Sequence, residues 1–426
     1  MHPRYVARRL VVQVFLAGLV VVVPGGPAIA AGRLATPAPE PIRAALQSAW
    51  QRHPDYRVTQ AQLAAAAARL DAADQPLYNP ELEFVSDDEG SDRTTTAGVN
   101  LTLDLSGKRR VRGDAASARL TRSEAEAKLR RRDFALQWVN AWVGLEAAEQ
   151  RVKTGERRLN LLERFTDLAE RQFAADDISG LDRDVALLAR DQAQAEQATL
   201  LVERAEASAR FRTLGGEPEV PSGLALPDEI PPAPAPIDAA SISQLPESLI
   251  ADASQLAAER DIVVAERNRI ADPTVGLRGG RIDYGPGNDN VVGISLSIPL
   301  FVRNSYRAEV VAARADADEV VAEGDKVRAQ LAAERVQSVE SYRATRQAWE
   351  RWRSSRGTNV DRSADLLERL WREGELSTSD YLLQLNQTLD TALAGAQLRA
   401  RLWSTYTNYL TTAGELERWV GLEGTP

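Results

Sequence analysis

A short alternation of apolar and polar residues occurs twice in this sequence, and each copy is followed by a long run with helical spacing. Residues 98–105 read GVNLTLDL, and residues 291–300 read VVGISLSIPL. Such alternation puts apolar side chains on one face of a β-strand and small or polar side chains on the other. The pattern therefore predicts one unit, a pair of strands followed by a long helix, that is used twice.

Proline positions divide each half of the chain into a helix, a β-hairpin and a helical hairpin. Asn79-Pro80 and Asp272-Pro273 end the first helix of each half, because proline cannot continue a helix and constrains the residue before it. No proline occurs between Lys108 and Phe173, where apolar residues recur at helical spacing. That run predicts a helix of about 100 Å.

The predicted elements of the first half are a helix at 42–73, strands at 81–85 and 98–105 around an acidic loop at 87–93, and helices at 108–173 and 181–214. Those of the second half are a helix at 247–270, strands at 274–283 and 291–300, a helix at 304–370 and a return helix that ends near residue 412. The predicted division of the chain is a signal peptide at 1–30, a first repeat at 31–214 (β-hairpin 81–105, helical hairpin 108–214), a Pro-rich linker at 215–245, a second repeat at 246–414 (β-hairpin 274–300, helical hairpin 304–412) and a C-terminal tail at 415–426.

The N-terminus has the pattern of a secretory signal peptide. Arginines within the first nine residues precede about 14 mainly apolar residues, and Ala28-Ile29-Ala30 forms a cleavage site of the A-x-A type. The alternative is a membrane anchor, which is disfavoured because a spanning helix needs about 20 apolar residues. We expect cleavage after Ala30 and export of the mature chain.

The strands themselves are typical of an outer-membrane β-barrel wall, with about nine residues that are apolar on one face only. The residues expected to line the lumen are Asn100, Thr102, Ser295 and Ser297. A soluble, half-buried sheet is the alternative interpretation of the strands alone. A spanning sheet cannot leave its edges open in lipid, and four strands are too few to close a barrel. Three chains would supply twelve strands and a water-filled lumen, whereas two would supply eight, whose interior side chains would fill.

Composition removes several function classes. The net charge of −9 gives a nucleic-acid partner no electrostatic support. The chain has no cysteine and only two histidines, so we expect no disulfide framework, no metal site, no catalytic triad and no cofactor. An enzyme is therefore not expected. Gly107-Lys108-Arg109-Arg110 could indicate phosphate binding, but at the end of a barrel strand it marks the water boundary beside outer-membrane lipid headgroups.

The duplicated unit resembles the TolC-like family of outer-membrane efflux proteins. Leu103-Asp104-Leu105-x-Gly107-Lys108-Arg109 and Pro299-Leu300-Phe301-x-Arg303-Asn304 are most similar to the cobalt–zinc–cadmium efflux branch. The resemblance implies a mixed α/β membrane protein, mostly α, in which long antiparallel helical hairpins form an α-barrel. Four strands per protomer would contribute to a shared, trimeric, 12-stranded β-barrel in the outer membrane. It further implies a homotrimer that extends into the periplasm and docks a periplasmic adaptor (membrane fusion protein) linked to an inner-membrane RND pump.

The resemblance also assigns roles to the two hairpin tips. The family pattern, aromatic-x-x-Gly-x-x-Ser/Thr-x-x-Asp, is matched from Trp371 to Asp380, while in the copy that starts at Phe173 Asp176 stands where glycine is expected. Such a tip needs a residue that tolerates positive φ. The residues implied to gate the pore are Asp380 and Asp182, and those implied to dock the adaptor are Ile178, Ser179, Gly374, Glu375, Leu376 and Ser377. Helix N-terminal carboxylates that stabilise the macrodipole are the alternative interpretation of both aspartates.

The function favoured by these patterns is a passive outer-membrane conduit of a tripartite efflux system, with heavy-metal cations as the expected substrates. One alternative is a conduit for drugs or for type I secretion. An alternative from a different class is a periplasmic structural or tethering protein built from helical rods.

Overall fold

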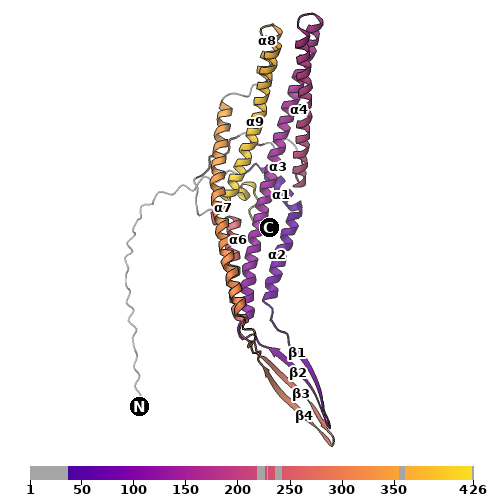
Figure 1. Cartoon of the computed structure of the whole chain (residues 1–426), viewed down its shortest axis with the longest axis vertical. Helices are drawn as coiled ribbons and strands as arrows, with labels where there is room; N and C mark the ends of the chain where they lie inside the picture. The colour runs from indigo at the N-terminus through magenta and orange to yellow at the C-terminus, as the bar shows by residue number, and fades with distance from the viewer. Residues whose placement is uncertain (1–36, 218–225, 228, 236–241, 355–359, 425–426) are drawn as a thin grey trace, which may run out of the picture. The chain divides into compact units, whose positions relative to one another are not determined.

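The computed structural model describes the chain apart from residues 1–36, 218–225, 228, 236–241, 355–359 and 425–426 (Figure 1). The predicted signal peptide at 1–30 therefore lies outside the described residues. Two strand pairs interrupt the helices, one between α2 and α3 and one between α6 and α7. The helices are α1 (Glu40–Arg52), α2 (Pro54–Ala73), α3 (Lys108–Ala174), α4 (Gly180–Thr213), α6 (Pro246–Asn268), α7 (Arg307–Ser354), α8 (Val360–Arg372), α9 (Thr378–Ala413) and α10 (Leu416–Val420).

The four strands form one antiparallel sheet in the order β1-β2-β3-β4, so the two predicted hairpins lie side by side (Figure 1). Their bounds are β1 (Glu81–Glu89), β2 (Asp92–Thr102), β3 (Thr274–Tyr284) and β4 (Gly287–Ser297). The sheet has two free edges, β1 and β4, within the described residues. The expected fold class, mostly helical with four antiparallel strands, is confirmed.

The predicted acidic loop at 87–93 is wrong, because β1 and β2 extend through it to a tight turn. Gly90, with φ 69°, supplies the left-handed residue that this turn needs. At their C-terminal ends β2 and β4 are shorter than predicted. β2 stops at Thr102 and β4 at Ser297, instead of at residues 105 and 300. Pro299 has no N–H for a further ladder bond, and Asp104 is used to cap α3.

The first predicted helix is two helices, because Pro54 starts a new one. His53, the residue before this proline, is extended (φ −69°, ψ 142°), and its ring Nδ1 accepts a hydrogen bond from Asp55 N–H at 3.2 Å. The long helix predicted at 108–173 is confirmed as α3, which ends one residue later, at Ala174. In the second half, α7 and α8 occupy the range predicted for one helix, on either side of residues 355–359.

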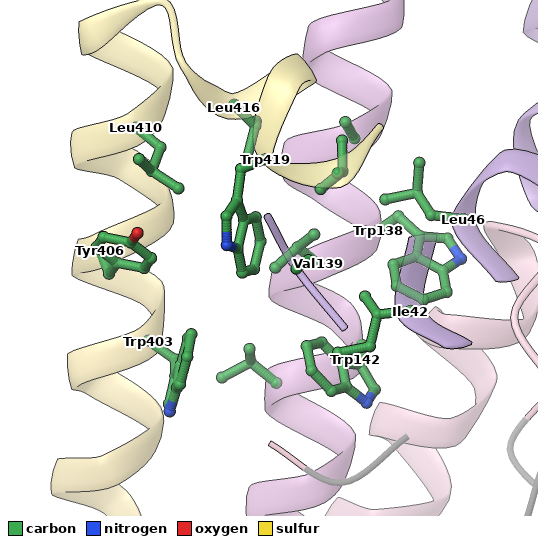
Figure 2. Packing of buried hydrophobic residues seen from close by; sticks show 14 of the residues in the cluster. Ile42, Leu46, Trp138, Val139, Trp142, Trp403, Tyr406, Leu410, Leu416 and Trp419 are labelled. Carbon is green, nitrogen blue, oxygen red and sulfur yellow. The ribbon is translucent and has the colours of Figure 1, made fainter. Parts of the chain in front are cut away.

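The main apolar core surrounds α10, a helix that lies in the predicted tail at 415–426 and was not expected. Trp419 is 3% exposed and packs on Trp403 and Tyr406 of α9, with ring centroids 6.3 and 5.9 Å away. Figure 2 shows Trp419 between these α9 rings and Val139 of α3. Ala38 N–H donates to Trp419 O at 2.8 Å, so the segment before α1 is tied to the same place. No described helix has the length and apolarity needed to cross a bilayer.

Candidate functional sites on the strands and the hairpin tips

The register of the sheet sorts its side chains into an apolar face and a polar face. In one ladder row Leu82, Val99, Leu277 and Ile294 lie side by side across all four strands. Their exposed fractions are 75%, 47%, 61% and 81%, although burial of a side chain of this kind is worth about 1.5–3 kcal/mol. An apolar surface this exposed needs another apolar phase or a partner to cover it.

The four predicted lumen residues share the opposite face. Asn100 and Ser295 flank Gly276, where a Cβ would lie 2.1 Å from the amide oxygen of Asn100 and 2.3 Å from the hydroxyl of Ser295. Thr102 and Ser297 both pair with Thr274 in the next row, and the hydroxyl oxygens of Thr102 and Thr274 are 2.8 Å apart. The structure thus brings all four together on the polar face. The lumen-lining role of this face stays a prediction.

A buried ion pair joins the two repeats where the strands meet the helices. Lys108 Nζ lies 2.8 Å from Asp272 Oδ2, and the two side chains are 10% and 3% exposed. The same ammonium donates to Ile270 O at 2.7 Å, and the Tyr78 hydroxyl donates to Asp272 at 2.8 Å. Burial and then this hydrogen bond raise the pKa of Tyr78 to about 12, so the hydroxyl stays protonated at neutral pH. Lys108 is consequently not free to bind phosphate.

Asp104 caps the long helix α3 from the end of β2. Its two carboxylate oxygens accept hydrogen bonds from Lys108 N–H and Arg109 N–H, both at 2.8 Å. Burial by itself would raise the pKa of this carboxyl, but the backbone N–H groups at the helix start outweigh it and hold the pKa below its usual value. The junction between β2 and α3 is therefore held by charged groups as well as by the chain connection.

The two hairpin tips have the same backbone geometry although their sequences differ. Asp176 has φ 58° and Gly374 has φ 74°, so the chain reverses through the left-handed region in both. In each tip the following residue donates its N–H to the carbonyl five positions back, at 2.8 Å in the first and 3.0 Å in the second. The prediction that Asp176 replaces the tip glycine is confirmed, at a conformational cost of about 1–2 kcal/mol.

Both predicted gate residues cap the helices on which they lie. The Ser377 hydroxyl donates to the Asp380 carboxylate at 2.7 Å and accepts from Asp380 N–H at 3.1 Å. Ser179 and Asp182 repeat this pair at 2.6 and 3.1 Å. The sequence register between the two tips, Ser179 with Ser377, is thereby supported. A cap of this kind stabilises a helix by about 1 kcal/mol, so each carboxylate has a structural role whether or not it gates a pore.

Of the predicted docking residues, Ser179, Gly374, Glu375 and Ser377 are exposed, whereas Ile178 and Leu376 are half-buried. The two half-buried side chains pack against the second apolar cluster, which joins the α3–α4 and α8–α9 hairpins just behind the tips. In this cluster the Phe165 ring lies 4.5 Å from Trp371 and stacks on Tyr381 at 4.4 Å between centroids.

Arg158 reinforces the same contact and was not predicted from the sequence. It lies 2.7 Å from Glu196 of α4, and it donates to the amide oxygen of Asn386 on α9 at 2.9 Å. Its side chain is only 10% exposed. The signal that could have indicated it is an arginine on the apolar stripe of α3, three residues before Leu161. Among the described residues, no three histidine, aspartate or glutamate side chains are grouped so as to hold a metal ion.

The chain is similar in sequence to two curated metal-resistance proteins. It is 30% identical over 261 residues to the cobalt-zinc-cadmium resistance protein CzcC of Cupriavidus metallidurans, a match that covers 57% of this chain and 60% of CzcC. It is 26% identical over 328 residues to the nickel-cobalt-cadmium resistance protein NccC of Alcaligenes xylosoxydans xylosoxydans, covering 74% of each chain. The chain therefore spans less than two thirds of CzcC. No family model matches.

Solved structures share the fold along nearly the whole chain. A membrane protein from Pseudomonas aeruginosa superimposes with a TM-score of 0.72 at 18% identity, covering 92% of this chain and all of the other. The outer membrane protein VceC from Vibrio cholerae gives a TM-score of 0.70 at 16% identity, covering 88% of this chain and 96% of VceC. At such identities the likeness is one of fold.

Proposed function

Because this chain belongs to the TolC-like outer-membrane efflux proteins, in their heavy-metal resistance branch, we propose that it is one protomer of a trimeric outer-membrane efflux channel. The observation that carries the proposal is the four-stranded sheet. Its apolar face is exposed along all four strands, and both of its edges, β1 and β4, are unpaired within the described residues.

Membrane lipid would cover the exposed apolar face of the sheet. The two edges must then be paired with other strands. An open edge leaves unpaired N–H and C=O groups, each of which costs several kcal/mol in a bilayer. Pairing β1 of one copy with β4 of the next closes the sheet, and three copies make twelve strands. The face with Asn100, Thr102, Ser295 and Ser297 would then line a lumen wide enough for water.

The helices would continue this channel into the periplasm. α3 is 67 residues long, or about 100 Å, and runs from the strand junction to the first tip. We propose that the tips, at Ile178 and Ser179 and at Gly374 to Ser377, dock a periplasmic adaptor that links the channel to an inner-membrane RND pump. The channel itself is a passive conduit with no catalytic step.

Heavy-metal cations are the proposed substrates, on the strength of the names of the two sequence relatives. The pump selects what enters such a system, so the conduit needs no ligand set of its own. The test is the sensitivity of a deletion strain to a panel of metals and drugs. Restored resistance to divalent metals alone supports the proposal, whereas restored resistance to drugs alone favours a drug conduit.

The channel proposal itself is tested by fractionation and by conductance. We expect the mature protein in the outer-membrane fraction, and we expect the purified, detergent-extracted protein to raise the conductance of planar bilayers in steps of uniform size. A periplasmic tethering protein would be recovered in the soluble fraction and would leave the conductance unchanged.

The gate role of Asp380 can be separated from its capping role. Asp380→Asn keeps a side chain that can bond with Ser377 but removes the charge, and Asp182→Asn is the matched change at the other tip. A ring of three carboxylates at the narrow end favours cations. Asp380→Asn should therefore lower the cation-to-anion permeability ratio and change the single-channel conductance, while Asp182→Asn should change both less. No effect of either change would reject the gate, whereas equal effects would mean that both carboxylates contribute to it.

A further inference from the structure

Arg278 on β3 is the one basic side chain on the polar face of the described sheet, and it lies across a glycine toward an open edge. Its ladder neighbours in the same row are Gly98 on β2 and Gly293 on β4. A Cβ on Gly293 would lie 3.1 Å from Arg278 Nε and 3.3 Å from its Cγ. The three atoms nearest to a Cβ on Gly98 would be Arg278 Cβ, Leu277 O and Arg278 Cα, with none from the outer part of the arginine side chain. The side chain therefore extends over β4, away from β1 and β2.

No hydrogen bond or ion pair joins the side chain of Arg278 to another residue in the described part of the chain. The carboxylate of the same row, Glu83, lies on β1, two strands away on the other side, or about 10 Å between the strand axes. That carboxylate already accepts a hydrogen bond from Asn100 Nδ2 at 2.9 Å. The exposed guanidinium thus points away from the acid of its own protomer and toward the free edge of the sheet.

The other free edge, β1, is acidic on the same face. Alternation puts one set of five β1 residues on the polar face, namely Glu81, Glu83, Val85, Asp87 and Glu89. Side chains alternate with a period of two, so any register that keeps the two faces continuous and pairs Gly293 with a β1 residue places one of these five beside it. Four of the five are carboxylates, and all four are exposed.

We propose that Arg278 forms an ion pair with a β1 carboxylate of a second copy of this chain, across the seam where β4 of one protomer meets β1 of the next. The inference rests on the proposed function, since it needs adjoining copies to close the sheet. It adds the chemistry of the seam: a guanidinium from β3 reaches over Gly293 of β4 to the partner's β1. Opposite charges placed beside each other in a sheet stabilise that pairing, and like charges oppose it.

The test is charge reversal in mixed trimers, read as the temperature at which trimers dissociate in dodecyl sulfate. Arg278→Glu alone, and Glu83→Arg alone, should each lower this temperature by several degrees. Copies of the two variants with different tags are then co-expressed, and mixed trimers are purified through both tags. Two of the three seams in a mixed trimer carry opposite charges again, so the temperature should recover. Glu81→Arg, Asp87→Arg and Glu89→Arg are mixed in the same way to find the register.

A matched control uses an ion pair that lies within one chain. Arg281 and Asp283 pair on the other face of β3 at 3.1 Å. Mixing Arg281→Glu copies with Asp283→Arg copies restores no pair, so no recovery is expected. Recovery in the control, or no recovery at any of the four β1 positions, would overturn the proposal, as would Arg278→Glu trimers as stable as the parent.

A milder variant guards against failure to fold. Arg278→Gln should give trimers whose dissociation temperature depends less on salt than that of the parent, because an exposed ion pair is screened by salt. Equal salt dependence would contradict the ion pair. If the parent chain forms no trimers at all, the proposed function fails instead, so the two failures are distinct.

Discussion

The sharpest prediction for the stability of the fold concerns Asp272. Replacing it by Asn removes the negative partner of a Lys108 ammonium whose side chain is 10% exposed, at a site where the two charged atoms lie 2.8 Å apart. Breaking a buried ion pair from one side costs about 3–5 kcal/mol, because the remaining charge is left without compensation. The Asn side chain can still accept the hydrogen bond from the Tyr78 hydroxyl, so the lost stability comes from removing the negative charge.

The expected shift in melting temperature follows from the size of the described unit. Unfolding entropy is about 2.1 cal/mol/K per residue, which for the unit of about 390 residues gives about 0.8 kcal/mol/K. A loss of about 4 kcal/mol therefore lowers the melting temperature by about 5 °C, measured by the helical circular dichroism signal in detergent at fixed protein concentration.

Asp261→Asn is the matched control for this experiment. Arg119 of α3 and Asp261 of α6 also pair across the two repeats, at 2.6 Å, but their side chains are 55% and 42% exposed. Exposed pairs contribute about 0–1 kcal/mol, so this change should shift the melting temperature by about 1 °C or less. Equal shifts for the two variants, or a shift of less than about 1 °C for Asp272→Asn, would refute the assignment of Lys108 and Asp272 as a buried pair.

Two further predictions concern the tips and pH. Asp176→Gly should stabilise the protein by about 1 kcal/mol, since glycine adopts the φ of 58° without strain, and a fall in melting temperature would contradict the tip geometry. The lowered pKa of Asp104 contributes stability that is present above the unfolded-state pKa near 3.8 and is lost as pH falls through the folded-state pKa. Between about pH 5 and pH 3 the melting temperature of the parent should therefore fall by more than that of Asp104→Asn. Identical profiles of melting temperature against pH would contradict this role of Asp104.

Local patterns in the sequence predicted the elements whose cause is local. The start of α3 at Lys108 follows from the end of an alternating strand, and its length follows from the absence of proline. The left-handed position of Asp176 followed from aligning the two tips. The break at Pro54 is not predicted, because the alanine-rich run after it favours one continuous helix.

Contacts between distant parts of the chain could not be predicted in this way. Lys108 and Asp272 are 164 residues apart, and nothing around either residue indicates its partner. The helix α10 is short, and its burial depends on a surface formed jointly by α1, α3 and α9. Arg278 looks like an ordinary strand residue until the register shows the glycines on both sides of it.

The measurement that bears most directly on the account is the number of chains in the purified, detergent-extracted particle, determined by light scattering with correction for bound detergent. A shared wall of twelve strands predicts three chains of the mature protein per particle. A mature chain that stays monomeric and dissolves in water without detergent would contradict the account. Its apolar strands and open edges would then need neither lipid nor other copies of the chain.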